Sequence, residues 1–170
     1  ANYKYYSENL VRLADHILPA QMEELLAQSR LATGSASTAF RSLVSADMQF
    51  PKITDGNGNE ATVSEGNYLL NMTSPDRELR KNSFQGLMGT YHKYRNTLAS
   101  TLTGSCRTAN FYATAHKYPD TLTASLAADN IPTSLYDGLI QTVHDNLAPL
   151  HEYKKKKKDV LGFEELHPYD

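Results

Sequence analysis

Phe50-Pro-Lys-Ile-Thr-Asp-Gly-Asn-Gly-Asn-Glu60, followed by Ser74-Pro-Asp-Arg-Glu-Leu-Arg80, is the stretch that decides the fold of this chain. Glycine and asparagine readily adopt the positive φ angles of a tight turn, so residues 55–59 predict the tip of a β-hairpin. Ser74 as the N-cap and Pro75 at the first helical position then predict the start of a long helix. Apolar residues face each other across the tip and extend the hairpin over about residues 48–63: Met48, Phe50, Ile53, Ala61 and Val63.

Apolar residues at helical spacing occupy most of the remaining chain. A first helix is expected over residues 3–17, a second from Pro19 and a third after Ser37. The long helix that starts at Ser74 should continue, kinked or as a pair of helices, to about Tyr118. Three glycines weaken it, because glycine loses the most backbone freedom in a helix: Gly86, Gly89 and Gly104.

The last third of the chain predicts one more break and one more helix. Asp129-Asn-Ile-Pro132 interrupts the helical pattern, and the final helix should kink at Pro149 and end at Gly162. We therefore expect a mainly α fold, with several long helices and one β-hairpin, in a single helical unit over residues 1–170.

The composition indicates a globular protein with no electrostatic preference for nucleic acid. The 170 residues are 40% hydrophobic and 21% charged, and the formal net charge is −2. No apolar run approaches the roughly 18 residues of a membrane span, and the sequence shows no signal-peptide core. Because the chain begins with Ala1 and ends at Asp170, directly after an aromatic residue, we expect a fragment of a longer polypeptide.

The histidines do not form a zinc motif. A zincin uses His-Glu-x-x-His, because the i, i+4 spacing places both imidazoles on one helical face. None of the six histidines has a partner at that spacing. His144 and His151 are expected to share a face of one helix, either as a loose metal pair or, as we prefer, as two residues at the boundary between core and solvent.

Three other features have both a chemical and a structural interpretation. Cys106 beside Arg107 is a reactive thiol or a buried small apolar residue, and we expect the second because no base is nearby. Asp55–Glu60 contains oxygen ligands but lacks the length of an EF-hand calcium loop, so a turn is expected. Lys154–Lys158 is a polyanion site or a solvated helix end whose cations complement the helix dipole, and we expect the second.

An ordered series of segments along almost the whole chain resembles one enzyme family. The segments are Ser42–Ile53, Thr73–Lys81, Tyr91–Ala99, Asn110–Tyr118, Ala127–Pro132, Asn146–His151 and Leu166–Asp170. In this order and spacing they are similar to the oligoendopeptidase F group of zinc metallopeptidases, within the thimet-oligopeptidase-like clan.

The resemblance implies a cytoplasmic, zinc-dependent endopeptidase that cleaves short peptides inside a channel of a larger, zincin-type helical protein. The zinc ligands of the family are two histidines of a His-Glu-x-x-His helix and a later glutamate, in a region expected after Asp170. We therefore expect this chain to bind no metal and to be inactive without the catalytic part of the same polypeptide. His167, Tyr169 and Asp170 stand nearest that part and are candidates for lining or supporting the channel.

Two other functions remain open from the sequence. The chain is alternatively a non-catalytic helical interaction module related to these peptidases, or a polyanion-binding protein that uses Lys154–Lys158. If a catalytic part packs against this chain, one face of it should expose a contiguous apolar patch.

Overall fold

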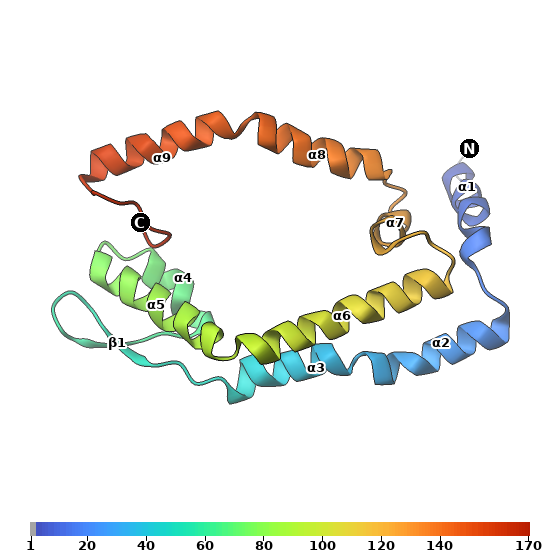
Figure 1. The fold of residues 1–170 in the computed structure, drawn as a ribbon, viewed down its shortest axis with the longest axis horizontal. Coiled ribbons are helices and arrows are strands. Elements are labelled where there is room, and N and C mark those ends of the chain that lie inside the picture. The colour runs from blue at the N-terminus through green and yellow to red at the C-terminus, as the bar shows by residue number, and fades with distance from the viewer. Residues whose placement is uncertain (1–2) are drawn as a thin grey trace. The chain divides into compact units, whose positions relative to one another are not determined.

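The computed structural model describes residues 3–170 and confirms the predicted fold class, a mainly helical protein with one antiparallel hairpin (Figure 1). By their internal contacts the residues divide into two units. The hairpin unit comprises Arg41–Ala99 and Leu147–Asp170, and the α8 unit comprises the described residues up to Phe40 together with Ser100–Asn146. The single helical unit expected over residues 1–170 stays a prediction.

The elements follow the chain in this order: α1 (Lys4–Leu13), a 3-10 turn (Ala14–His16), α2 (Ala20–Thr33), α3 (Ser35–Ser42), a π-helical turn (Leu43–Asp47), β1 (Lys52–Thr54), β2 (Glu60–Thr62), α4 (Glu65–Met72), α5 (Arg77–Lys93), α6 (Arg95–Ala115), α7 (Thr121–Ala127), α8 (Thr133–Asp145) and α9 (Leu147–Leu161). None of the helices described over residues 3–170 is long and apolar enough to cross a membrane.

The hairpin forms where it is predicted, with shorter strands than expected. Ile53 pairs with Ala61 in the antiparallel register, and Gly58 has a φ of 83° at the tip. The carboxylate of Asp55 accepts hydrogen bonds from the backbone N–H groups of Asn57 and Asn59, at 2.9 and 2.8 Å. The oxygen atoms that suggested a calcium loop are therefore occupied by the turn itself, which confirms the turn interpretation.

The core of the hairpin unit lies between the hairpin and α5. Ile53, Val63 and Leu87 are buried together. Partly buried side chains pack around them: Phe50, Ala61, Tyr68, Leu79 and Tyr91. The α5 backbone comes close to the hairpin at Gly86, where a Cβ would lie 3.1 Å from Val63 Cγ1, so this glycine belongs to the packing and does not merely weaken a helix.

The start of α5 differs from the prediction by two residues. Asp76, not Ser74, is the N-cap, and its carboxylate accepts the backbone N–H of Glu78 at 2.9 Å. Ser74 instead accepts the backbone N–H of Asp76 at 3.1 Å, in the turn before the helix. Both residue types cap helices well, so position in the turn, rather than residue type, decides which one does so.

Two of the long helical segments predicted from the sequence are each divided into two helices. The long pair predicted up to Tyr118 is α5 and α6, which separate at Tyr94. The last helical segment separates at Asn146 into α8 and α9. Pro149 lies in the first turn of α9, where its missing N–H has no helical partner to lose, so the predicted kink there is wrong.

Three helices end at a residue with a positive φ angle, in the left-handed region of the backbone. Gly162 ends α9 as predicted, with a φ of 67°. The N–H groups of Gly162 and Phe163 donate to the carbonyls of Asp159 and Lys158, which is the Schellman pattern. The same pattern occurs after α6 at Lys117 and after α7 at Asn130, with φ of 61° and 54°. No helix is predicted from the sequence at α7, which is only 7 residues long.

Polar contacts join segments of the α8 unit that are far apart in the sequence. The Tyr112 hydroxyl on α6 lies 2.9 Å from Ser29 Oγ and 3.0 Å from Thr33 Oγ1 on α2. The Nδ1 atoms of His16 and His116 each donate to the other residue's carbonyl oxygen, at 2.8 and 2.9 Å. Residues that are 100 positions apart are therefore joined by two reciprocal hydrogen bonds.

Two of the glycines predict opposite effects of the same substitution. A Cβ at Gly104 on α6 would lie 2.7 Å from the Cβ of Ala36 on α3, whereas nothing lies within 4 Å of a Cβ at Gly89 on α5. Gly104→Ala should lower the free energy of unfolding by about 1–3 kcal/mol through overpacking. Gly89→Ala should raise it by about 0.5–1 kcal/mol through helix propensity. Urea unfolding of both variants tests this pair, and equal shifts would show that α3 and α6 do not approach closely.

Candidate functional site

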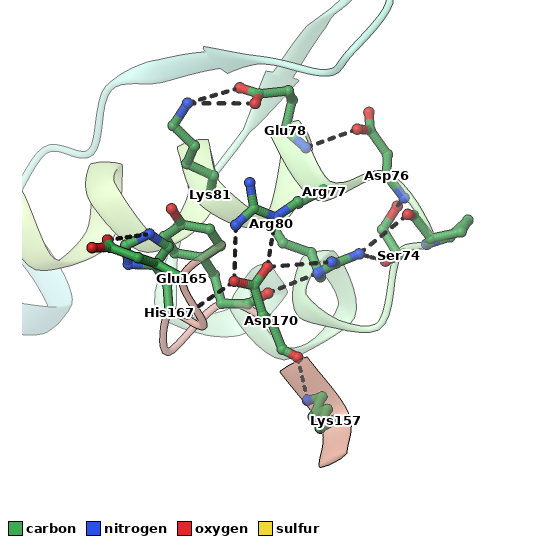
Figure 2. A network of polar contacts seen from close by, with 12 residues as sticks. Ser74, Asp76, Arg77, Glu78, Arg80, Lys81, Lys157, Glu165, His167 and Asp170 are labelled. Atoms are coloured by element: carbon green, nitrogen blue, oxygen red, sulfur yellow. Dashed lines mark hydrogen bonds and ion pairs between the residues drawn. The ribbon is translucent and has the colours of Figure 1, made fainter. Parts of the chain in front are cut away.

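Two of the candidate residues, His167 and Asp170, lie near the N-terminal end of α5 in the hairpin unit (Figure 2). The third, Tyr169, is bound there through its carbonyl oxygen, which accepts from Arg80. Arg77, the first residue of α5, donates from Nε and Nη2 to the two carboxylate oxygens of Asp170, at 2.7 and 2.9 Å. The Asp170 side chain has an exposed fraction of 0%. This bidentate geometry is among the strongest pairings that proteins use, and it joins residues 93 positions apart.

Arg80 ties the same segment to the turn before α5. Its Nε donates to the carbonyl oxygen of Tyr169 at 2.7 Å, and its Nη1 donates to the carbonyl oxygen of Ser74 at 2.8 Å. Its Nη2 lies 3.8 Å from Asp170 Oδ1. On the other side, Lys157 of α9 donates to the backbone carbonyl oxygen of Asp170. Three basic side chains therefore bring α5, α9 and residues 169–170 together.

Aromatic rings complete the cluster around Arg77. Its guanidinium lies 4.2 Å from the ring centroid of Phe163 and 5.4 Å from that of Tyr169. Tyr169 is buried, packs against Phe84 at a centroid distance of 5.8 Å, and stacks on His167 at 5.0 Å. Cation–π contacts of this kind partly replace the water that the arginine loses. We call Arg77, Arg80, Phe163, Tyr169 and Asp170 the arginine clamp.

The arginines of the clamp lower the pKa of the Asp170 carboxyl group. The hydrogen bonds from Arg77 lower the pKa of Asp170 below its ordinary value. The backbone N–H of His167 and the charges of Arg77 and Arg80 act in the same direction, whereas burial opposes them. Asp170 is therefore ionised at neutral pH and serves as an acceptor, not as a proton donor.

The three candidate residues differ in their surroundings. Asp170 and Tyr169 are buried in the clamp, while the His167 side chain keeps 39% of its surface exposed. The Nε2 atom of His167 lies 3.7 Å from a carboxylate oxygen of Glu165, which is itself exposed. The contacts of Tyr169 and Asp170 are those of a structural support, and a role in lining a channel stays a prediction for all three.

The other residues singled out in the sequence are not brought together. His144 lies on α8 and His151 on α9, both exposed, so the expectation that they share one helix is wrong. Cys106 is exposed, which corrects the expected burial: the inward face of α6 carries residues 101, 104, 105 and 108, and position 106 points away from it.

The described residues do not fit a zinc site. Over residues 3–170, no three His, Cys, Asp or Glu side chains gather where they would hold a metal ion. His151-Glu152 resembles the start of a zincin motif, but Lys155 stands where the second histidine is required. We therefore derive no step through a metal from the residues of this chain.

Comparisons with known proteins identify relatives along the whole chain. The family model of peptidase family M3 matches residues 70–170, and that of oligopeptidase F matches residues 1–50. The chain is 39% identical to oligopeptidase PepF of Bacillus subtilis, over 99% of this chain and 25% of that protein. It is 36% identical to group B oligopeptidase PepB of Streptococcus agalactiae, over 99% of this chain and 28% of that protein.

A solved structure agrees with these relatives. The crystal structure of oligoendopeptidase-F from Enterococcus faecium matches with a TM-score of 0.92 and 38% identity, over 99% of this chain and 33% of that chain. The chain thus spans about a quarter of the length of the curated relatives it matches first.

The clamp predicts a loss of stability in acid. Because the folded pKa of Asp170 is lowered, the ion pair contributes stability above the unfolded pKa of about 3.9 and loses it as pH falls through the folded value. Asp170→Asn should lower the free energy of unfolding at pH 7 by about 2–3 kcal/mol and make it less sensitive to pH below 5. Urea unfolding between pH 2 and 7 (roughly the range of carboxyl titration) measures both effects.

The matched control is Asp159→Asn, which removes an exposed carboxylate of α9 that forms no hydrogen bond or ion pair within the described part of the chain. Its stability should stay within about 0.5 kcal/mol of the original. Equal behaviour of the two variants would contradict a structural role for the clamp.

Proposed function

Because the chain belongs to peptidase family M3, we propose that the protein containing it is a zinc-dependent oligoendopeptidase that hydrolyses short peptides. The observation that carries this proposal is 39% identity to an oligopeptidase over 99% of the chain. The M3 model also matches residues 70–170, which include the whole arginine clamp. A cytoplasmic location is part of the same proposal.

In this proposal the zinc lies outside residues 3–170, on a His-Glu-x-x-His motif in another part of the polypeptide. A zinc ion supplies a nucleophile at neutral pH by lowering the pKa of bound water. The residues of this chain would supply scaffold and one wall of the substrate channel. Of the three candidates, His167 has the exposed edge that could face a peptide, while Tyr169 and Asp170 hold its segment in place.

The partner that this proposal requires is the remainder of the same polypeptide, and α8 offers it a surface. All of α8 is exposed, and its apolar side chains recur at helical spacing: Leu135, Tyr136, Leu139, Ile140 and Val143. An amphipathic helix gains its stability mainly by packing this stripe against a neighbour. The relatives are about four times longer than the chain, so they contain the additional polypeptide that such a stripe requires.

A non-catalytic interaction module is the second candidate function, and the same apolar stripe favours it. In that case another protein would cover α8. The two functions differ in what the gene encodes, because a zinc peptidase of the proposed kind must contain His-Glu-x-x-His elsewhere in its polypeptide.

Peptide hydrolysis tests the proposal directly. The full-length protein should cleave a quenched fluorescent oligopeptide, and a chelator should abolish the cleavage until zinc is restored. Residues 1–170 alone should release no fluorescence above the rate of a buffer control. A full-length protein that is folded and zinc-loaded but inactive would favour the interaction module.

Substitution on α8 tests the partner. Leu139 is 63% exposed in this chain, so Leu139→Asp should change the stability of residues 1–170 by less than about 0.5 kcal/mol. In the full-length protein, where we propose that the stripe is covered, the same change should cost about 2–5 kcal/mol. Thermal unfolding of both proteins measures the difference, with Gln141→Asp on the exposed polar side as control. Equal losses of stability in the two proteins would show that no other part of the full-length polypeptide covers the stripe.

A further inference from the structure

The lysine run of α9 lines a hollow in the hairpin unit. Its walls are Lys154, Lys155 and Lys158 from α9 and Leu166, His167 and Pro168 from the segment that follows, and it is an open hollow with a volume of about 590 Å³. The left-handed Gly162 turns the chain back after α9, so that this segment faces the helix. The volume lies within the range of sites for small molecules, roughly 300–1,000 Å³.

The lysines of the run differ in their contacts. Lys157 donates to the carbonyl oxygen of Asp170 and thereby joins α9, which forms one wall of the hollow, to the arginine clamp. Lys158 stands four residues after Lys154 and three after Lys155, so it is a neighbour of both on the surface of the helix. In the described part of the chain, no carboxylate forms an ion pair with any of these three. From the sequence the run is expected to be a solvated helix end, and the hollow beside it is not predicted.

The lining combines concentrated positive charge with an apolar surface. An ammonium group is a point charge that attracts carboxylates without demanding a planar geometry. Leu166, Pro168 and the lysine stems provide the apolar part, which suits the backbone and side chains of a peptide. The one aromatic ring in the lining is that of His167, which already stacks on Tyr169, and the lining includes no Tyr or Phe ring. An oligonucleotide, whose bases need rings on which to stack, therefore fits the hollow less well.

Building on the proposed peptidase function, we propose that this hollow is a subsite for the carboxylates of short acidic peptides. The ammonium groups of Lys154, Lys155 and Lys158 bind the carboxylate, and Leu166 and Pro168 contact the adjoining residue. The carboxylate comes either from an acidic side chain or from the free carboxyl end of the peptide. The arginine clamp and Lys157 join the end of the segment after α9 to α5 and α9, so we expect the site to exist before the ligand arrives.

Binding to the full-length protein tests the subsite. The probe is a short Ala-Gly peptide with two glutamates, labelled at its amino end with a rhodamine dye, and its affinity is measured by fluorescence anisotropy. Mass spectrometry afterwards shows whether the peptide is intact. Lys154→Gln/Lys155→Gln/Lys158→Gln should weaken binding about tenfold. Lys4→Gln/Lys93→Gln/Lys156→Gln removes the same number of charges from exposed positions outside the hollow and should leave the affinity within about twofold.

Variants of the peptide identify the carboxylate. If a peptide with glutamine in place of both glutamates binds the original protein more weakly, the acidic side chains occupy the hollow. If a peptide with an amidated carboxyl end binds more weakly, the free carboxyl end occupies it. Equal affinity of all the peptides, or equal loss in the two triple variants, would overturn the subsite. Tighter binding of inorganic polyphosphate than of the peptide, with the same dependence on the three lysines, would assign the hollow to another ligand and also overturn it.

The outcome is separable from that of the proposed function, because the readout is binding. If the full-length protein binds the peptide through the three lysines but cleaves no peptide, the proposed subsite stands and the proposed peptidase function is contradicted. Chelator-sensitive cleavage, with the same affinity in both triple variants, would retain the peptidase and reject the subsite.

Discussion

The two parallel hydrogen bonds from Arg77 to Asp170 are the contact on which the hairpin unit depends. They join the start of α5 to residues that follow α9, across 93 positions of sequence. Isolated charges would be costly in such a place, since the Asp170 side chain is fully buried. The cost is offset because both carboxylate oxygens accept from Arg77, the backbone of His167 donates as well, and aromatic rings flank the guanidinium.

The position of the clamp also connects it to the hairpin. Asp76, the residue before Arg77, caps α5 and accepts the backbone N–H of Gly56 at the hairpin tip, at 2.6 Å. The same turn of α5 therefore fixes the hairpin on one side and the segment after α9 on the other. Lys157 of α9 donates to the carbonyl oxygen of Asp170, so the same segment also contacts the helix that carries the lysines of the hollow.

The α8 unit uses a different means of holding its helices. Gly104 lets α6 approach α3 closely, and Tyr112 joins α6 to α2 by hydrogen bonds to hydroxyl groups. Such contacts fix the geometry of the helices but bury few large apolar side chains. The apolar stripe of α8 remains exposed, as expected for a helical scaffold that completes its packing with further polypeptide. The contiguous apolar patch expected from the sequence stays a prediction, and the exposed apolar residues of α8 are the candidates for it.

The sequence by itself determined the elements whose signals are local. The hairpin at residues 55–59, the end of α9 at Gly162 and the helical character of most of the chain follow from backbone preferences, and an ordered series of short segments was enough to indicate the family. Only the tertiary structure decided which residues meet. Asp76 rather than Ser74 caps α5, Cys106 faces outward, and Arg77 finds Asp170, because these outcomes depend on packing between segments far apart in the chain. Local preferences act over a few residues, whereas a buried ion pair or a hollow exists only where distant backbones converge.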